Sequence, residues 1–227
     1  MQNVKLSDLV KQHPLVTNFL NDKHIDYCCG GDRMLFDAIT ELETDRAAFL
    51  AELEQFLKNS AGQMKATIPE ELYDYSIAQL IDHLEATHHR DERMLLEEVD
   101  AKVNKILLAH YAHHKDELLQ VHALFSDLRK ELLEHFAREE REVFPLMRQP
   151  ISKESLDKVE ALEVDHLGAG AIIKQLQVAT HDFTAPADGC PTYIATYDLL
   201  RKLTEDIFIH IFKENAILFP KFEKEAN

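Results

Sequence analysis

Tryptophan is absent from this chain, and glycine and proline are scarce, with six and seven among 227 residues. Turn-rich β proteins use many such residues, whereas leucine, alanine, glutamate and lysine, which suit helices, are abundant here. No run approaches the roughly 18 uninterrupted apolar residues that a membrane-spanning helix requires. These absences predict an all-α protein that does not cross a membrane.

An excess of basic residues is also missing, since the formal net charge is −16. Such a charge argues against nucleic acid or an anionic membrane as a partner. The N-terminus has no basic start followed by an apolar run, so we expect a cytoplasmic protein. Cysteine is too rare for a disulfide framework, and Cys28, Cys29 and Cys190 are expected to be reduced, with Cys190 inert.

One sequence motif occurs twice in this chain. The stretch from His135 to Pro145 returns 75 residues later, and the two copies agree at His, Glu, Phe and Pro. Within each copy, the pairs His135/Glu139 and His210/Glu214 are four residues apart. On a helix, such a pair shares one face with Cβ atoms about 5–6 Å apart. Each copy therefore predicts an imidazole and a carboxylate that bind the same metal.

One His and one Glu are too few ligands for a transition metal, so each copy needs a partner upstream. His166 stands 44 residues before His210, and His89 stands 46 before His135. The adjacent His88 lies nearer the centre of the apolar stripe, so the residues alone leave this pair open. Glu140 is matched by Asn215 in the other copy, which favours Glu139 as the ligand.

A helical hairpin used twice is typical of a four-helix bundle that holds a dinuclear site between its helices. Imidazoles and carboxylates without a thiolate favour iron, then manganese, over a structural zinc. We therefore predict an antiparallel bundle over residues 76–227, a small helical domain over 1–58 and a linker over 59–75. Local features predict where helices begin and end. Ser76 caps one helix, and either Thr44 or Asp45 caps another. His110 to His114 break the first long helix of the bundle, and the second long helix ends around Pro145.

Other residues are candidates for a role beside the metal. Cys28 and Cys29 precede two glycines at a tight turn, where a thiol pair could take part in redox chemistry or pass on a metal. Glu131 and Asp206 each lie four residues before a predicted His ligand and could approach its imidazole or carry a proton. Asp165, beside His166, is a weaker candidate of the same kind.

These motifs together resemble a known family. The segment Asp26-Tyr-Cys-Cys-Gly-Gly31, followed by the histidines and the two His-x3-Glu copies, is similar to the di-iron repair of iron centres proteins, which join a short ScdA-type N-terminal domain to a hemerythrin-like domain. The resemblance selects His89 over His88, because Ile81-Asp82-His83 and Arg93 stand where the family has them. This sequence departs from the family pattern at Lys115, where the family tends to have proline. The resemblance implies two carboxylate-bridged non-haem iron ions with the ligands His89, His135, His166, His210, Glu139 and Glu214.

The resemblance also implies a function. These proteins are associated with the repair of iron-sulfur clusters damaged by nitric oxide or oxidative stress, through iron donation or through reduction of nitric oxide at the di-iron centre. Cys28 and Cys29 are thought to belong to that function, and Glu131 is a candidate proton carrier. Members are cytoplasmic and often homodimeric, with damaged iron-sulfur proteins as recipients. The alternative is a hemerythrin-like sensor or carrier that binds a diatomic without turnover.

Overall fold

The computed structural model describes residues 1–60 and 68–225, so part of the predicted linker lies outside the described residues. The chain forms two compact units, one made of Met1–Leu80 and Phe208–Glu225 and the other of Ile81–Ile207. Over the described ranges the structure is helical, and its one β feature is an isolated bridge between Lys5 and Met34. The predicted all-α class is confirmed. No helix in these ranges is long and apolar enough to cross a membrane.

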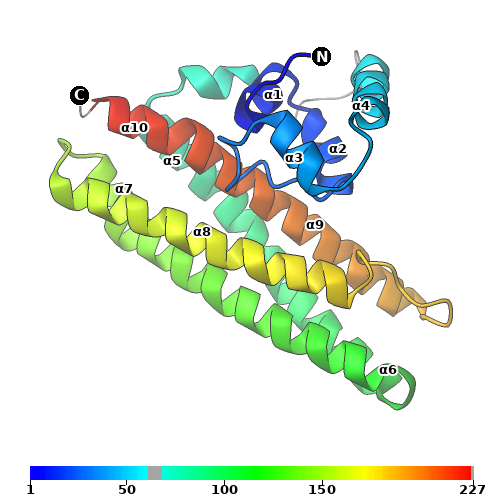
Figure 1. Ribbon diagram of the computed structural model, residues 1–227. Coiled ribbons are helices and arrows are strands. Elements are labelled where there is room, and N and C mark those ends of the chain that lie inside the picture. Colours follow the sequence, from blue (N-terminus) through cyan, green and yellow to red (C-terminus); the bar gives the residue numbers. More distant parts are fainter. Residues whose placement is uncertain (61–67, 226–227) are drawn as a thin grey trace. The chain divides into compact units, whose positions relative to one another are not determined.

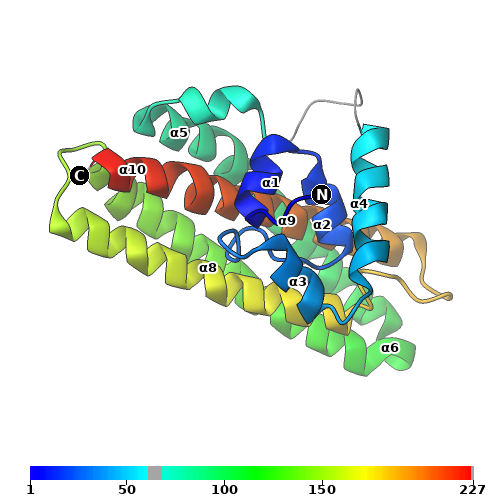
Figure 2. The same ribbon diagram turned by 45° about the horizontal axis from the view of Figure 1, so that its top comes forward.

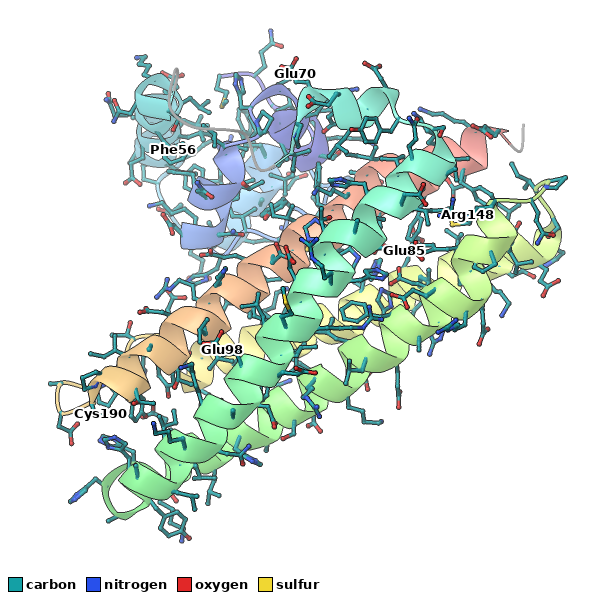
Figure 3. All side chains as sticks on the ribbon, turned by 180° about the vertical axis from the view of Figure 1, so that it is seen from behind. Phe56, Glu70, Glu85, Glu98, Arg148 and Cys190 are labelled. Atoms are coloured by element: carbon teal, nitrogen blue, oxygen red, sulfur yellow. The ribbon has the colours of Figure 1, made fainter. Side chains whose placement is uncertain are left out.

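The second unit is a bundle in which long helices run side by side (Figure 1). It begins within α5 (Ile77–Leu84) and ends within α9 (Pro191–Lys213). Between these lie the π-helical turn η2 (Glu85–His89), α6 (Arg90–Arg138), the π-helical turn η3 (Glu139–Val143), α7 (Phe144–Met147) and α8 (Lys153–Ala179). The helix α6 folds back on itself and supplies two neighbouring arms of the bundle (Figure 3). The predicted helical bundle is confirmed as the fold class, while its predicted bounds, residues 76–227, stay a prediction.

The reversal within α6 falls at His114, whose backbone angles (φ −125°, ψ 30°) are not helical. This confirms the predicted break between His110 and His114. On both sides of the break the buried residues recur every three or four positions, which is the spacing of one helix face. They form the core of the two arms: Leu95, Val99, Val103, Ile106, Leu118, Val121, Phe125, Leu128 and Leu132.

Side chains mark the starts of several helices as predicted. The Ser76 hydroxyl accepts a hydrogen bond from the Gln79 amide at 3.3 Å, and the Gln79 side chain accepts one from the Ser76 amide at 2.9 Å. Asp45, rather than Thr44, caps the helix that follows it, because its carboxylate accepts from the Ala48 amide at 2.8 Å. Each such cap satisfies amides that a helix start leaves without partners.

The first unit gathers the short N-terminal helices (Figure 2). They bury an apolar core in which the Phe19 and Phe49 rings meet edge to face, 5.3 Å apart. The C-terminal segment belongs to the same unit, and its Phe212 ring lies 6.0 Å from the Tyr27 ring. The elements of this unit outside α5 and α9 are α1 (Leu6–Gln12), α2 (Val16–Asp22), α3 (Leu35–Glu41), α4 (Arg46–Ser60), the 3-10 turn η1 (Glu70–Asp74), the π-helical turn η4 (Glu214–Leu218) and α10 (Phe219–Glu225).

Candidate metal centre

Four buried side chains converge inside the bundle unit. The Glu139 carboxylate lies between two imidazoles, with one oxygen 3.3 Å from His89 Nε2 and the other 3.3 Å from His135 Nε2. The Nε2 atoms of His166 and His135 are 3.2 Å apart. These residues come from η2, α6, the start of η3 and α8, so three separate stretches of the chain supply them. Their nitrogen and oxygen atoms face a common point.

The surroundings of the Glu139 side chain show whether these four residues fit a metal ion. It is fully buried, and neither of its oxygens accepts a hydrogen bond from any residue that the structure describes. Burying a carboxylate that accepts no hydrogen bond costs several kcal/mol, and buried charges are therefore usually hydrogen-bonded or bound to metals. Imidazole and carboxylate donors are those that iron, manganese and zinc accept. The residues present fit a metal ion beside Glu139.

The second copy of the motif has the same local arrangement in the first unit. His210 Nε2 lies 3.7 Å from a Glu214 oxygen, and both side chains are buried. In both copies the His and Glu are one helical turn apart and point in the same direction. The repeated sequence therefore produces a repeated pair of buried donors.

A π-helical turn begins at the glutamate of each copy, η3 at Glu139 and η4 at Glu214. Proline follows each turn at positions 145 and 220. Proline has no N–H and would clash with the carbonyl four residues earlier in an ordinary α-helix. A π turn shifts that register, and such turns are frequent at functional sites. The helical path continues through Pro145 and ends at Met147, which confirms the predicted helix end around Pro145 to within two residues.

The adjacent histidines on the first helix face different neighbours. His89 Nε2 faces Glu139, whereas His88 Nδ1 lies 2.8 Å from Asp206 and 3.7 Å from Glu92. Both imidazoles are buried, which explains why the apolar periodicity alone did not separate them. His89 is the one that shares its surroundings with Glu139 and His135.

Comparison with known proteins agrees with this geometry. The model of the hemerythrin HHE cation binding domain matches residues 80–222. The chain belongs to the hemerythrin family. The ScdA_N domain, a domain of unknown function, matches residues 2–57 of this hemerythrin-family chain.

Relatives of this chain match it over nearly its whole length. Proteins described as iron-sulfur cluster repair protein YtfE are 28% identical in Enterobacter sp. (strain 638), 27% in Citrobacter koseri and 26% in Shigella boydii. Each alignment covers 216 residues, 95% of this chain and 94% of the relative. The resemblance to the repair of iron centres family, predicted from the sequence, is confirmed.

The hemerythrin-like bundle also supplies carboxylates behind its imidazoles. His89 Nδ1 lies 2.8 Å from Glu140, which also pairs with Arg93 at 2.9 Å. Burial raises the pKa of Glu140, but the hydrogen bonds from His89 and Arg93 outweigh it and leave this pKa below its usual value. A carboxylate on Nδ1 holds the imidazole so that Nε2 can bind a metal. The sequence showed Glu140 only as the neighbour of Glu139.

His135 has a similar neighbour behind it. Its Nδ1 lies 3.6 Å from Asp165, which also pairs with Arg138. The His135 imidazole and then the Arg138 guanidinium, acting against burial, lower the pKa of Asp165. Glu131, which was expected to approach this imidazole, is exposed on α6. The structure thus brings the weaker candidate, Asp165, to His135.

In the first unit, the thiols of Cys28 and Cys29 are both free, with their sulfurs 3.9 Å apart. Asp26 organises this turn, because one carboxylate oxygen accepts from the amides of Cys29 and Gly30 at 3.0 and 3.1 Å. The neighbouring Cys29 and burial raise the pKa of Cys28 well above its usual value. The Asn215 amide donates to the Cys28 carbonyl at 3.2 Å, so the second His-x3-Glu copy touches this turn.

Cys190 has surroundings unlike those of an inert thiol. His110 Nε2 lies 3.2 Å from its sulfur, and this contact, together with the Tyr193 and Thr192 amides, lowers its pKa to about 7. Donors to the sulfur favour the thiolate, which is the reactive form. We expect iodoacetamide to modify Cys190 with a midpoint near pH 7 and His110→Gln to move that midpoint upward, toward about 8.5. Site-resolved mass spectrometry across pH checks this, and an unchanged midpoint in the variant would contradict it.

Proposed function

We propose that this chain binds two iron ions and repairs damaged iron-sulfur clusters. As the family resemblance implies, the ligands would be His89, His135, Glu139, His166, His210 and Glu214, with the two carboxylates bridging the ions. The observation that carries the proposal is Glu139, a fully buried carboxylate between two imidazole nitrogens at 3.3 Å. The names of the relatives supply the cellular role, since they are described as iron-sulfur cluster repair proteins.

The protein part of the mechanism follows from the side chains around Glu139. Glu140 holds His89 with its Nε2 directed at Glu139. The rings of Phe136 and Phe144 stack on the His89 imidazole at 4.8 and 5.8 Å and exclude water from that side. When bound, the iron pair would supply one-electron chemistry and an open position for a small ligand. Glu139 and Glu214 would balance much of the added positive charge.

The small ligand we propose is nitric oxide or an oxygen species, and the recipients are iron-sulfur proteins damaged by these molecules. Repair could proceed by reduction of nitric oxide or by iron donation. In the second route, Cys28 and Cys29 would pass iron on, because two thiols and the Asp26 carboxylate stand together at this turn. The free thiols fit the reducing conditions of the cytoplasm, where we place the protein. We also propose that the protein forms a homodimer, as the family resemblance implies.

The two routes can be separated by one experiment on the iron-loaded protein. A purified protein whose [4Fe–4S] cluster has been destroyed by nitric oxide is incubated anaerobically with inorganic sulfide and the diferrous form of wild type, Cys28→Ala/Cys29→Ala or Glu131→Gln. Nitric oxide is added to a parallel sample, in which the diferrous centre supplies the two electrons that each nitrous oxide requires. Iron donation predicts cluster recovery with matching loss of iron from the wild type, and little recovery with the thiol variant. Nitric oxide reduction predicts nitrous oxide release that the thiol variant retains, while Glu131→Gln slows it if Glu131 carries a proton.

Two results would overturn the proposal. One is a chain that binds less than one iron per molecule after anaerobic loading and dialysis. The other is stable, reversible binding of oxygen or nitric oxide with neither cluster recovery nor nitrous oxide, which would instead establish a sensor or carrier.

A further inference from the structure

A second group of metal-binding side chains lies at the end of the bundle where α6 reverses. His110 and His114 come from α6, and Asp188 and Cys190 come from the loop just before α9 (Figure 3 labels Cys190). Cys190 lies at the opposite end of the bundle from Arg148 (Figure 3). None of these residues belongs to the proposed iron ligands. We call this group the reversal cluster.

The reversal cluster consists of two pairs that already touch. His110 Nε2 lies 3.2 Å from Cys190 Sγ, and His114 Nε2 lies 3.0 and 3.1 Å from the two oxygens of Asp188. The two imidazole rings are 6.2 Å apart between centroids. Two imidazoles on one tetrahedral ion, with Zn–N lengths of about 2.0–2.1 Å, would place their centroids roughly 5 Å apart. The two imidazoles would therefore have to move closer together for all four donors to bind one ion.

The kinds of donor point to the metal. Zinc is bound by thiolate, imidazole and carboxylate in four-coordinate tetrahedral sites, and softer thiolate ligands disfavour magnesium and calcium. We propose that the reversal cluster is a zinc site whose ligands are His110, His114, Asp188 and Cys190. Their spacing, His-x3-His on one segment and Asp-x-Cys on the other, places two ligands on each side of the ion.

The surroundings prepare these donors for a cation. The Tyr193 ring meets both imidazoles edge to face, at 5.2 Å from His110 and 5.8 Å from His114, and restricts their orientation. The amides at the start of α9 contact the sulfur and favour the thiolate that zinc requires. Cys190 and His114 are partly exposed, so an ion can reach them from solvent. Bound zinc would tie the loop before α9 to the reversal of α6.

Cobalt is the probe that tests this site, because a thiolate bound to tetrahedral Co²⁺ gives a charge-transfer band in the near ultraviolet. The iron-loaded, fully reduced protein carries Cys28→Ala/Cys29→Ala, so that Cys190 is its one thiol. We expect one equivalent of Co²⁺ to bind with this band and one equivalent of Zn²⁺ to remove it. Cys190→Ser should abolish the band, and His114→Gln should weaken binding about 10–100-fold, as loss of a metal-site group typically does.

His113→Gln is the matched control, because His113 is exposed beside His114 on the same segment. It should bind Co²⁺ as the parent does. Circular dichroism of each variant checks that the bundle is folded. The proposal is overturned if the parent shows no charge-transfer band, if the band survives Cys190→Ser, or if His114→Gln binds as tightly as His113→Gln. The result is independent of the iron function, since the iron ligands are unchanged in every variant.

Discussion

Glu139→Leu should bind at most one iron per chain while its metal-free form becomes more stable. The proposed bridge serves both ions, so its loss removes a ligand from each. Leucine has a similar size and removes a fully buried carboxylate that accepts no hydrogen bond from the described residues. Burying a carboxylate that accepts no hydrogen bond is costly, so its replacement by a well-packed apolar side chain removes that cost when the two neighbouring imidazoles are neutral. Metal analysis after anaerobic loading and urea unfolding of the metal-free protein measure the two effects.

The opposite signs of these effects separate loss of a ligand from loss of the fold. Glu134→Leu is the matched control, because Glu134 is exposed on α6 and pairs only loosely with Lys130, at 3.8 Å. It should retain two irons and change the free energy of unfolding by less than about 0.5 kcal/mol. Full iron content in Glu139→Leu would show that Glu139 is not a ligand.

Phe136→Ala should lower the free energy of unfolding of the metal-free protein by about 3–5 kcal/mol, the usual cost of truncating a buried phenylalanine. The Phe136 ring is fully buried, stacks on the His89 imidazole at 4.8 Å and lies 5.0 Å from the Arg93 guanidinium. Its removal leaves a cavity beside a proposed ligand. Iron should also be lost faster to a chelator, because His89 is no longer held on that side.

Leu133→Ala provides the comparison for this change. Leu133 lies on the same helix and is 37% exposed, so its truncation removes less buried surface and leaves no closed cavity. It should cost clearly less than Phe136→Ala and leave the rate of iron loss unchanged. Equal destabilisation by the two variants would show that the Phe136 ring contributes no more to the free energy of unfolding than the partly exposed Leu133 side chain does.

Much of this molecule could be predicted from short-range pattern. The helix period, the caps at Ser76 and Asp45 and the break at His114 are local, because each depends on residues within a few positions of one another. The pairing of His135 with Glu139 is local for the same reason, since residues four apart on a helix always share a face. The sequence by itself therefore determined the helical class, the repeated donor pairs and the family.

Only the tertiary structure decided which side chains support the imidazoles. Glu140 meets His89 and Asp165 meets His135 across helices that are distant in sequence, and no periodicity relates the members of such pairs. The contact between Cys190 and His110 was not predicted from the sequence, because these residues are 80 positions apart. Contacts of this kind depend on how whole helices pack and on the rotamer that each side chain adopts there. The local sequence pattern predicts the helix face on which a residue lies, but the packing of the helices determines which distant residue it contacts.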